Sequence, residues 1–367
     1  MSKVVSSKCT IGLSPFQVIF AAQLTAVATE SSKVPFQREE KAEYLRAEKM
    51  VLLKQLRQLA FGISLEEATF ARRGFRRNNV EAQQRLEQIG YTFLHGYHAA
   101  ALENDDPEAL VTKLNSVAPE LRGFAFEGAA MGQALLDYLT PWKRNRVQVF
   151  LAGVGAAHTY MVYVGVGWML ARMRQRIEPS LAKLDPLLGW LAVDGYGFHE
   201  GYFHASRYVE QQTIPRGVSD YARRVFDQGL GRSLWFVNGA DVNHIPVTIA
   251  AFCPSRQADL WSGIGLACAY AGGVDRSAIE ALRTAARSYL PQLAQGAAFA
   301  AKARSMAGNI SVHTELACEV LCGISAEAAA EITDIALKDL PTNGALPGYE
   351  VWRQRIQHQF LAEGVKA

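Results

Sequence analysis

Apolar residues recur along most of the chain at the three- to four-residue spacing of amphipathic helices. No alternating strand patterns joined by Asn-Gly or Asp-Gly turns interrupt this spacing. Ser64 stands where a helix cap is expected, and Glu67, three residues later, can complete a capping box. The pattern therefore predicts an all-α protein built from packed helix pairs.

The same pattern suggests where the protein divides. Residues 38–60 are charged and leucine-rich, which predicts a surface helix, and the stretch from Pro341 to Pro347 precedes a last helix that ends near Glu363. We expect an N-terminal extension over residues 1–45 and one helical domain with an apolar cavity over residues 46–367.

Glycines recur at a spacing of about 66 residues in two interleaved series. One series is Gly62, Gly128, Gly195, Gly263 and Gly323, and the other is Gly96, Gly165, Gly229 and Gly296. An apolar residue and a polar residue precede Gly128, Gly195 and Gly263. This weak repeat predicts two-helix units arranged as an α/α barrel or toroid, and the alternative is an irregular helical domain with glycines at helix contacts.

Residues 147–171 form the one stretch long enough for a membrane span, and His158 is the only side chain in it that is acidic or basic in the usual sense of Asp, Glu, Lys, Arg and His. A buried helix, or two helices with a bend near Gly153–Gly155, is the favoured interpretation. The chain has 367 residues, 49% of them hydrophobic, and a net charge of +3, which supports a large core and gives no indication of nucleic-acid binding. Five scattered cysteines predict no disulfide framework and a cytoplasmic location, with membrane association through local basic runs left open.

The segment from Leu191 to His204 places acidic groups and histidines among aromatic and aliphatic residues. Buried Asp194, His199 and Glu200 would be costly unless they are paired or bound to a ligand. A carboxylate–imidazole site for iron is one interpretation, but the zinc pattern His-Glu-x-x-His fails because His204 comes one position too late. The other interpretation is neutral histidines bonded within the core, so the metal and cofactor content stays open.

Acid chemistry is a second possibility. Glu127 and Asp194 occupy equivalent positions in the repeat, and a buried carboxyl shifted toward its protonated form can act as a general acid. Aromatic faces can stabilise a cation, and the candidate lining residues are Phe126, Trp168, Tyr196, Phe198, Tyr202, Trp235 and Trp261. This is the equipment of a terpene or meroterpenoid cyclase, although an ordinary aromatic core contains it too.

Several motifs together resemble a known bacterial family over residues 50–325. They are Glu67-Ala-Thr-Phe-Ala-Arg-Arg-Gly-Phe75, Phe93-x-x-Gly-Tyr97, Phe126-Glu-Gly128, Asp194-Gly-Tyr-Gly-Phe-His199, Gly229-Leu-Gly-Arg-Ser-Leu-Trp-Phe236 and Arg256-x-x-Asp-Leu-Trp-Ser-Gly-Ile-Gly-Leu-Ala267. The family resembled is that of the UnbL-type proteins, encoded beside enediyne polyketide synthases. The resemblance implies natural-product biosynthesis on a polyene, beside an integral-membrane protein and a propeller-like UnbV-type protein.

Three functions follow as expectations. The leading one is an enzyme, or a subunit of one, that acts on a long apolar polyene; the others are an acid-initiated cyclase of isoprenoid chains and a non-catalytic carrier of an apolar substrate. The cavity is expected near residues 122–137, 155–173, 190–207 and 256–270. The catalytic candidates are Asp194, Glu127, His199, His204 and Asp259, and Arg232 joins the aromatic residues as a substrate-binding candidate.

Overall fold

The structure is a computed structural model that describes residues 38–103, 106–140, 142, 145–341 and 344–363. It comprises two compact units, residues 1–60 and residues 61–367. The expected N-terminal extension over residues 1–45 stays a prediction, because its residues 1–37 lie outside the described part. The helix expected at 38–60 is present as α2 (Arg38–Phe61).

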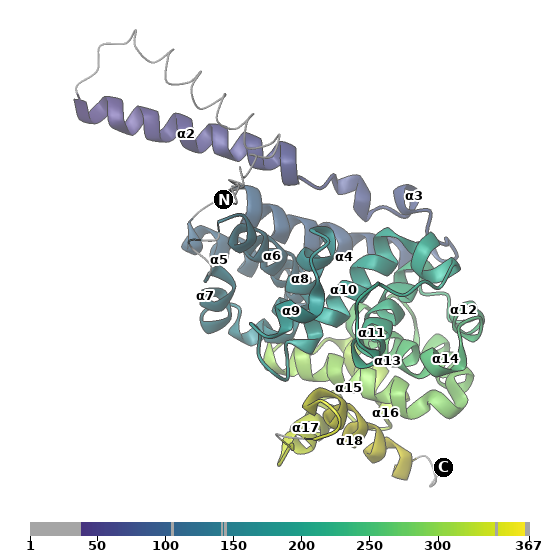
Figure 1. The fold of residues 1–367 in the computed structure, drawn as a ribbon. Helices are drawn as coiled ribbons and strands as arrows, with labels where there is room; N and C mark the ends of the chain where they lie inside the picture. The colour runs from purple at the N-terminus through teal and green to yellow at the C-terminus, as the bar shows by residue number, and fades with distance from the viewer. Residues whose placement is uncertain (1–37, 104–105, 141, 143–144, 342–343, 364–367) are drawn as a thin grey trace, which may run out of the picture. The chain divides into compact units, whose positions relative to one another are not determined.

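Every regular element that the structure describes is helical, which confirms the all-α prediction (Figure 1). Short helical turns separate several of the helices: η2 (Leu65–Ala68), η3 (Ala99–Glu103), η4 (Ala156–His158), η5 (Ser206–Glu210) and η6 (Arg287–Tyr289). The helices of the second unit are α3 (Phe70–Arg73), α4 (Val80–His98), α5 (Pro107–Asn115), α6 (Pro119–Leu139), α7 (Arg146–Ala152), α8 (Thr159–Arg172), α9 (Ile177–Leu181), α10 (Trp190–Phe203), α11 (Asp220–Val237), α12 (Ile245–Ala250), α13 (Pro254–Ala271), α14 (Arg276–Ala286), α15 (Leu290–Met306), α16 (Val312–Cys322), α17 (Ala326–Leu337) and α18 (Gly348–Glu363).

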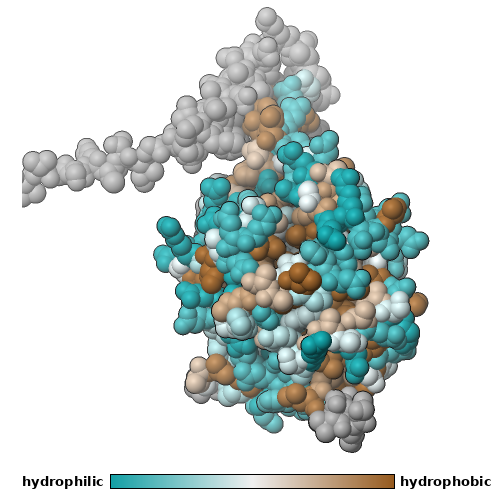
Figure 2. Space-filling view, turned by 90° about the vertical axis from the view of Figure 1, so that its right-hand side faces the viewer, coloured by the Kyte–Doolittle hydropathy of each residue, from teal (hydrophilic) through white to brown (hydrophobic). Residues whose placement is uncertain are grey.

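Seven long helices form the frame of the second unit, each packed against the next in chain order: α4, α6, α8, α10, α11, α13 and α15. The later helices of the row return toward the earlier ones, because α13 also contacts α4 and α15 also contacts α8. The helices α16, α17 and α18 pack beside α15. A closed barrel or toroid goes beyond these contacts and stays a prediction. On the face drawn in Figure 2, hydrophobic residues occur as small patches among hydrophilic ones, so the large apolar core lies inside.

Glycines set the spacing of this row. A Cβ atom built on Gly195 would collide with the carbonyl oxygen of Val164 on α8, and one on Gly197 with that of Phe226 on α11. The same pairing of one glycine toward the preceding helix and one toward the following helix recurs at 165 and 167, 229 and 231, and 263 and 265. Such close approach brings backbones into direct contact and leaves no room for a side chain.

The predicted spacing of about 66 residues spans two successive helices of the row, as two-helix units require. The two glycine series are one series with one helix about every 33 residues, because each helix of the row needs its own glycine at the crossing. The ends of the predicted series do not belong to it: Gly62 precedes η2, and Gly323 ends α16 with a left-handed φ of 74°.

Residues 147–171 are divided, as the favoured interpretation expected. α7 ends at Ala152, and the helical segment that includes α8 starts at Ala156 after a bend of 97°. Taken alone, none of the described helices has the length and apolar character of a bilayer span; this bent pair meets those criteria jointly. Met161 to Ala171 are all buried, between α6 and α10. The four described cysteines are free thiols, and Cys9 lies outside the described residues.

Candidate functional site

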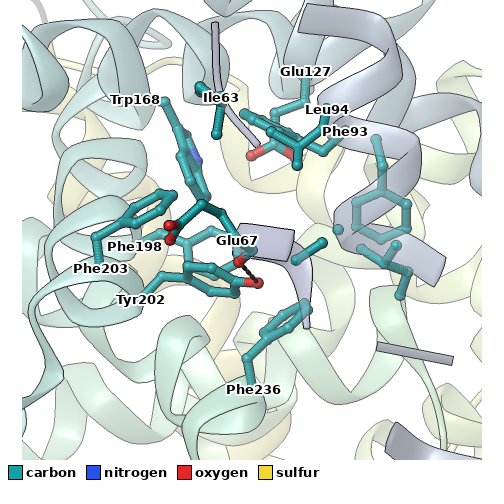
Figure 3. A pocket seen from close by; sticks show the side chains of 14 residues that line it. Ile63, Glu67, Phe93, Leu94, Glu127, Trp168, Phe198, Tyr202, Phe203 and Phe236 are labelled. Atoms are coloured by element: carbon teal, nitrogen blue, oxygen red, sulfur yellow. Dashed lines mark hydrogen bonds between the residues drawn. The ribbon is translucent and has the colours of Figure 1, made fainter. Parts of the chain in front are cut away.

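An apolar cavity lies where η2, α4, α6, α8, α10 and α11 meet (Figure 3). Its walls are mainly aromatic, from Phe93, Phe124, Trp168, Phe198, Tyr202 and Phe236. Two lining residues are acidic, Glu67 and Glu127. The free volume is about 40 Å³, room for roughly two or three water molecules.

Glu127 on α6 is the chemically unusual group of this cavity. Its side chain is buried, and Figure 3 shows the carboxyl directed into the cavity between α4 and α8. The atom Oε1 has no hydrogen-bond partner. Burial raises the pKa of Glu127 to about 7, since the opposing charge of Arg232 only partly offsets the lost hydration. Both protonation states are therefore populated near neutral pH.

Two buried donors in this part of the fold also lack hydrogen-bond partners. The indole N–H of Trp168 is close enough to lower the pKa of Glu127, yet it makes no hydrogen bond of normal geometry. The buried hydroxyl of Tyr270 also has no partner and lies against Gly123, one turn before Glu127. Buried polar atoms without partners are rare in folded proteins, so water or a ligand group is expected here.

Asp194 has the opposite environment. It is fully buried, and its two carboxylate oxygens are bound separately, one by the guanidinium of Arg232 and the other by Gln228 Nε2 at 2.8 Å. Arg232 stacks 4.6 Å above the ring of Phe198, a lining residue, and so links this ion pair to the cavity wall. Asp194 thus holds Arg232 in place, and the positive charge of Arg232 in turn lowers the pKa of Glu127, against the larger effect of burial.

Asp259 belongs to another network and does not line the cavity. Arg353 Nη2 donates to Asp259 Oδ1 at 2.7 Å, and Arg224 Nε donates to Oδ2 at 3.1 Å. Glu350 accepts from both arginines, so this network joins α11, α13 and α18. Its geometry is that of a structural cross-link.

Neither of the two histidine candidates lines the cavity. The ring of His199 is buried, meets Glu200 Oε1 at 3.2 Å and lies edge-on to Trp168 at 5.5 Å. Burial lowers the pKa of His199, which favours the neutral imidazole. His204 is exposed at the end of α10, with its ring 6.2 Å from that of His199.

The aromatic candidates divide into two groups. Trp168, Phe198 and Tyr202 line the cavity. The other four do not: Phe126 stacks on His158 at 4.1 Å, Trp235 donates to the carbonyl of Gly272, Tyr196 contacts Phe226, and Trp261 is buried in the general core.

Sequence reasoning missed the α4 wall and Glu67. The expected cap is real, because Ser64 Oγ accepts from the backbone N–H of Glu66. Glu67, however, pairs with Arg72 and Arg73 instead of closing a capping box. An acidic residue five and six positions before two arginines is the signal that could have indicated this loop.

The family model named DUF1702, protein of unknown function, matches residues 52–360. The chain belongs to the DUF1702 family. No curated protein and no solved structure matches it. The matched region includes the helical row and the cavity. The likeness to UnbL-type proteins is a finer assignment, which the family model does not show.

Metal-ligating side chains of this DUF1702 protein are dispersed. Over the part of the chain that the structure describes, no three His, Cys, Asp or Glu side chains are grouped as a metal site requires. The cavity itself is apolar and aromatic, and its Glu127 carboxyl keeps one oxygen without a hydrogen-bond partner.

Proposed function

We propose that this protein is an enzyme, or the catalytic subunit of one, that binds a long polyunsaturated chain in the aromatic cavity and uses Glu127 as a general acid and base. The observation that carries the proposal is an unpaired, buried carboxyl with a pKa of about 7 inside an otherwise apolar cavity. A group with a pKa near the working pH exchanges protons most efficiently.

The substrate class has two supports. The apolar walls suit a hydrocarbon chain, and the resemblance to UnbL-type proteins favours a polyene released by a polyketide synthase. The same resemblance suggests an integral-membrane protein and a propeller-like protein as working partners. An isoprenoid chain fits the walls equally well and is the alternative substrate.

The proposed step is balanced without a cofactor. The π electrons of a double bond take the proton of Glu127, which forms a new C–H bond at one end and leaves the Glu127 carboxylate. The other end becomes part of a delocalised cation. The faces of Trp168 and Phe198 stabilise that cation. The Glu127 carboxylate then removes a proton from another carbon, and a double bond forms there. Closure of a ring before this proton is lost would give cyclisation from the same cation.

The cavity must widen to admit such a chain. Its free volume of about 40 Å³ is far below the roughly 300 Å³ of small-molecule pockets. The segment that includes η2 is the movable wall we propose, and opening it would break the contacts that Ala68 makes with Gly90 of α4 and that Glu67 makes with α10. One of them is the bond from the Tyr202 hydroxyl to the Glu67 carbonyl oxygen, at 3.3 Å (dashed in Figure 3).

The test uses deuterium transfer. The purified protein is incubated in D₂O with a panel of conjugated polyenes, including parinaric acid, and the recovered chains are analysed by mass spectrometry. We expect deuterium in the chain with the wild type, none with Glu127→Gln, and wild-type incorporation with Glu280→Gln, a matched change at an exposed residue of α14. Binding of the chain, measured by fluorescence, should survive in Glu127→Gln.

Two results would contradict the proposal. Undiminished incorporation in Glu127→Gln would show that another group moves the proton. Tight binding without any incorporation by the wild type would favour the non-catalytic carrier.

A further inference from the structure

A second, polar cleft lies directly beside the aromatic cavity. Its volume is about 430 Å³, and it is lined by the end of α10, by η5 and by the residues around Gly74. Tyr202 and Phe203 line both spaces, so these two side chains form the wall between them. The turn η5 is a π-helix, a distortion that occurs often at functional sites.

Cationic and donor groups dominate this cleft. Arg73, Arg207 and His204 line it, with Glu210 as the only acidic lining residue. Arg207 is exposed and forms no ion pair with any residue that the structure describes; its guanidinium lies 5.2 Å from the Tyr208 ring. Arg73 pairs with Glu67 through Nη1, but its Nε is buried and has no hydrogen-bond partner.

Phe203 connects the two spaces. Its half-buried ring lies 5.0 Å from the guanidinium of Arg73, and the ring of the cavity residue Trp168 lies 5.9 Å away. No hydrogen bond holds this ring; a rotation that gives up its packing against His199, Tyr202 and Trp168 would join the cleft to the cavity.

We infer that this cleft binds the anionic head, a carboxylate or a phosphate, of an amphipathic chain whose apolar tail passes Phe203 toward Glu127. The inference rests on the proposed function and adds the substrate class: an apolar chain with a charged end. Arg207 and Arg73 Nε would pair with the head, as guanidinium groups do with both oxyanions, and His204 would donate a further hydrogen bond.

The experiment measures binding of cis-parinarate, a conjugated carboxylate that becomes fluorescent in apolar sites. Competitors with the same chain length but different heads then displace it: dodecanoate, dodecyl phosphate and methyl dodecanoate. We expect one or both charged chains to displace the probe at a concentration at least about tenfold lower than the methyl ester needs, a difference that salt should reduce. The better charged competitor identifies the head.

Variants locate the effect. Arg207→Gln combined with His204→Gln alters two exposed side chains and should remove most of the preference for charged chains while leaving displacement by the methyl ester unchanged. Arg283→Gln, an exposed arginine on α14, is the matched control and should behave as the wild type.

Equal displacement by ester and charged chains in the wild type would overturn the inference, as would an unchanged preference in the double variant. Neither result depends on Glu127, because binding and not turnover is measured. Conversely, failure of deuterium transfer with an intact preference for charged chains would contradict the proposed function and leave the head-group site standing.

Discussion

Glu127 and Asp194 occupy the same place on two helices of the row, yet the fold treats them differently. Each directly precedes a glycine at a helix crossing, and the backbone carbonyl of each contacts a glycine of the next helix, Gly165 and Gly229 respectively. Asp194 is bound by Arg232 and Gln228, whereas Glu127 keeps an unpaired oxygen in an apolar cavity. The backbone contacts of the two residues are alike, and only their side-chain partners differ. Asp194 forms a structural ion pair, whereas Glu127 is left as a candidate acid.

The largest expected effect is the loss of the ion pair. Asp194→Asn leaves the buried guanidinium of Arg232 without its counter-charge, which should lower the free energy of unfolding by about 3–5 kcal/mol. Urea denaturation measures the change. Asp334→Asn, in a half-exposed pair with Lys302, is the control and should cost about 1 kcal/mol or less. If the two variants lose the same small amount, Asp194 is not the buried anchor described here.

Glu127→Gln should have the opposite effect: relative to the wild type, the variant should gain stability as the pH rises. The pKa of Glu127 is about 7 in the folded protein against an ordinary value of 4.5, so its contribution to stability is complete below pH 4.5 and is lost as the pH rises through 7. The unfolding free energy of the variant minus that of the wild type should therefore increase by on the order of 3 kcal/mol between pH 4.5 and pH 8.5. Glu280→Gln should show no such increase, and a flat difference for Glu127→Gln would contradict the raised pKa.

The shared frame is tested by a matched pair of glycines. Gly165→Ala and Gly229→Ala each place a methyl group against a backbone carbonyl, and each should cost about 1–3 kcal/mol. Gly348→Ala, whose nearest neighbour would be Leu187 Cδ1 at 3.8 Å, should be tolerated. Thermal unfolding distinguishes them; a loss confined to one of the two crossings would show that the frame is not repeated.

The smallest effect concerns Trp168. Its indole N–H lowers the pKa of Glu127, so Trp168→Phe should move that pKa further upward. The midpoint of the pH-dependent stability difference described above should shift to higher pH. A downward shift would mean that the indole desolvates the carboxyl more than its N–H stabilises the charge.

The helical class and the bend in residues 147–171 could be predicted because they depend on local spacing and on glycine-rich breaks. The glycine series was visible too, but the partner of each glycine was not, since a glycine marks a crossing without telling which helices cross. The pairing of neighbouring helices is a property of the whole row.

The candidate site could be predicted only in part. Glu127, Trp168, Phe198 and Tyr202 were expected near a cavity and line one. The different roles of Glu127 and Asp194 were not predictable, because Arg232 lies 38 residues after Asp194 and meets it only through packing of α11 on α10. For the same reason Phe126, next to Glu127 in sequence, points to His158 and away from the cavity.

The most direct test of the account is the protonation state of Glu127 itself. Infrared spectra of the wild type minus those of Glu127→Gln, recorded between pH 4.5 and pH 9, isolate the C=O stretch of this one protonated carboxyl. The account predicts a band that is present at pH 5 and disappears with a midpoint near 7. A carboxyl already ionised at pH 5, with no such band, would contradict it.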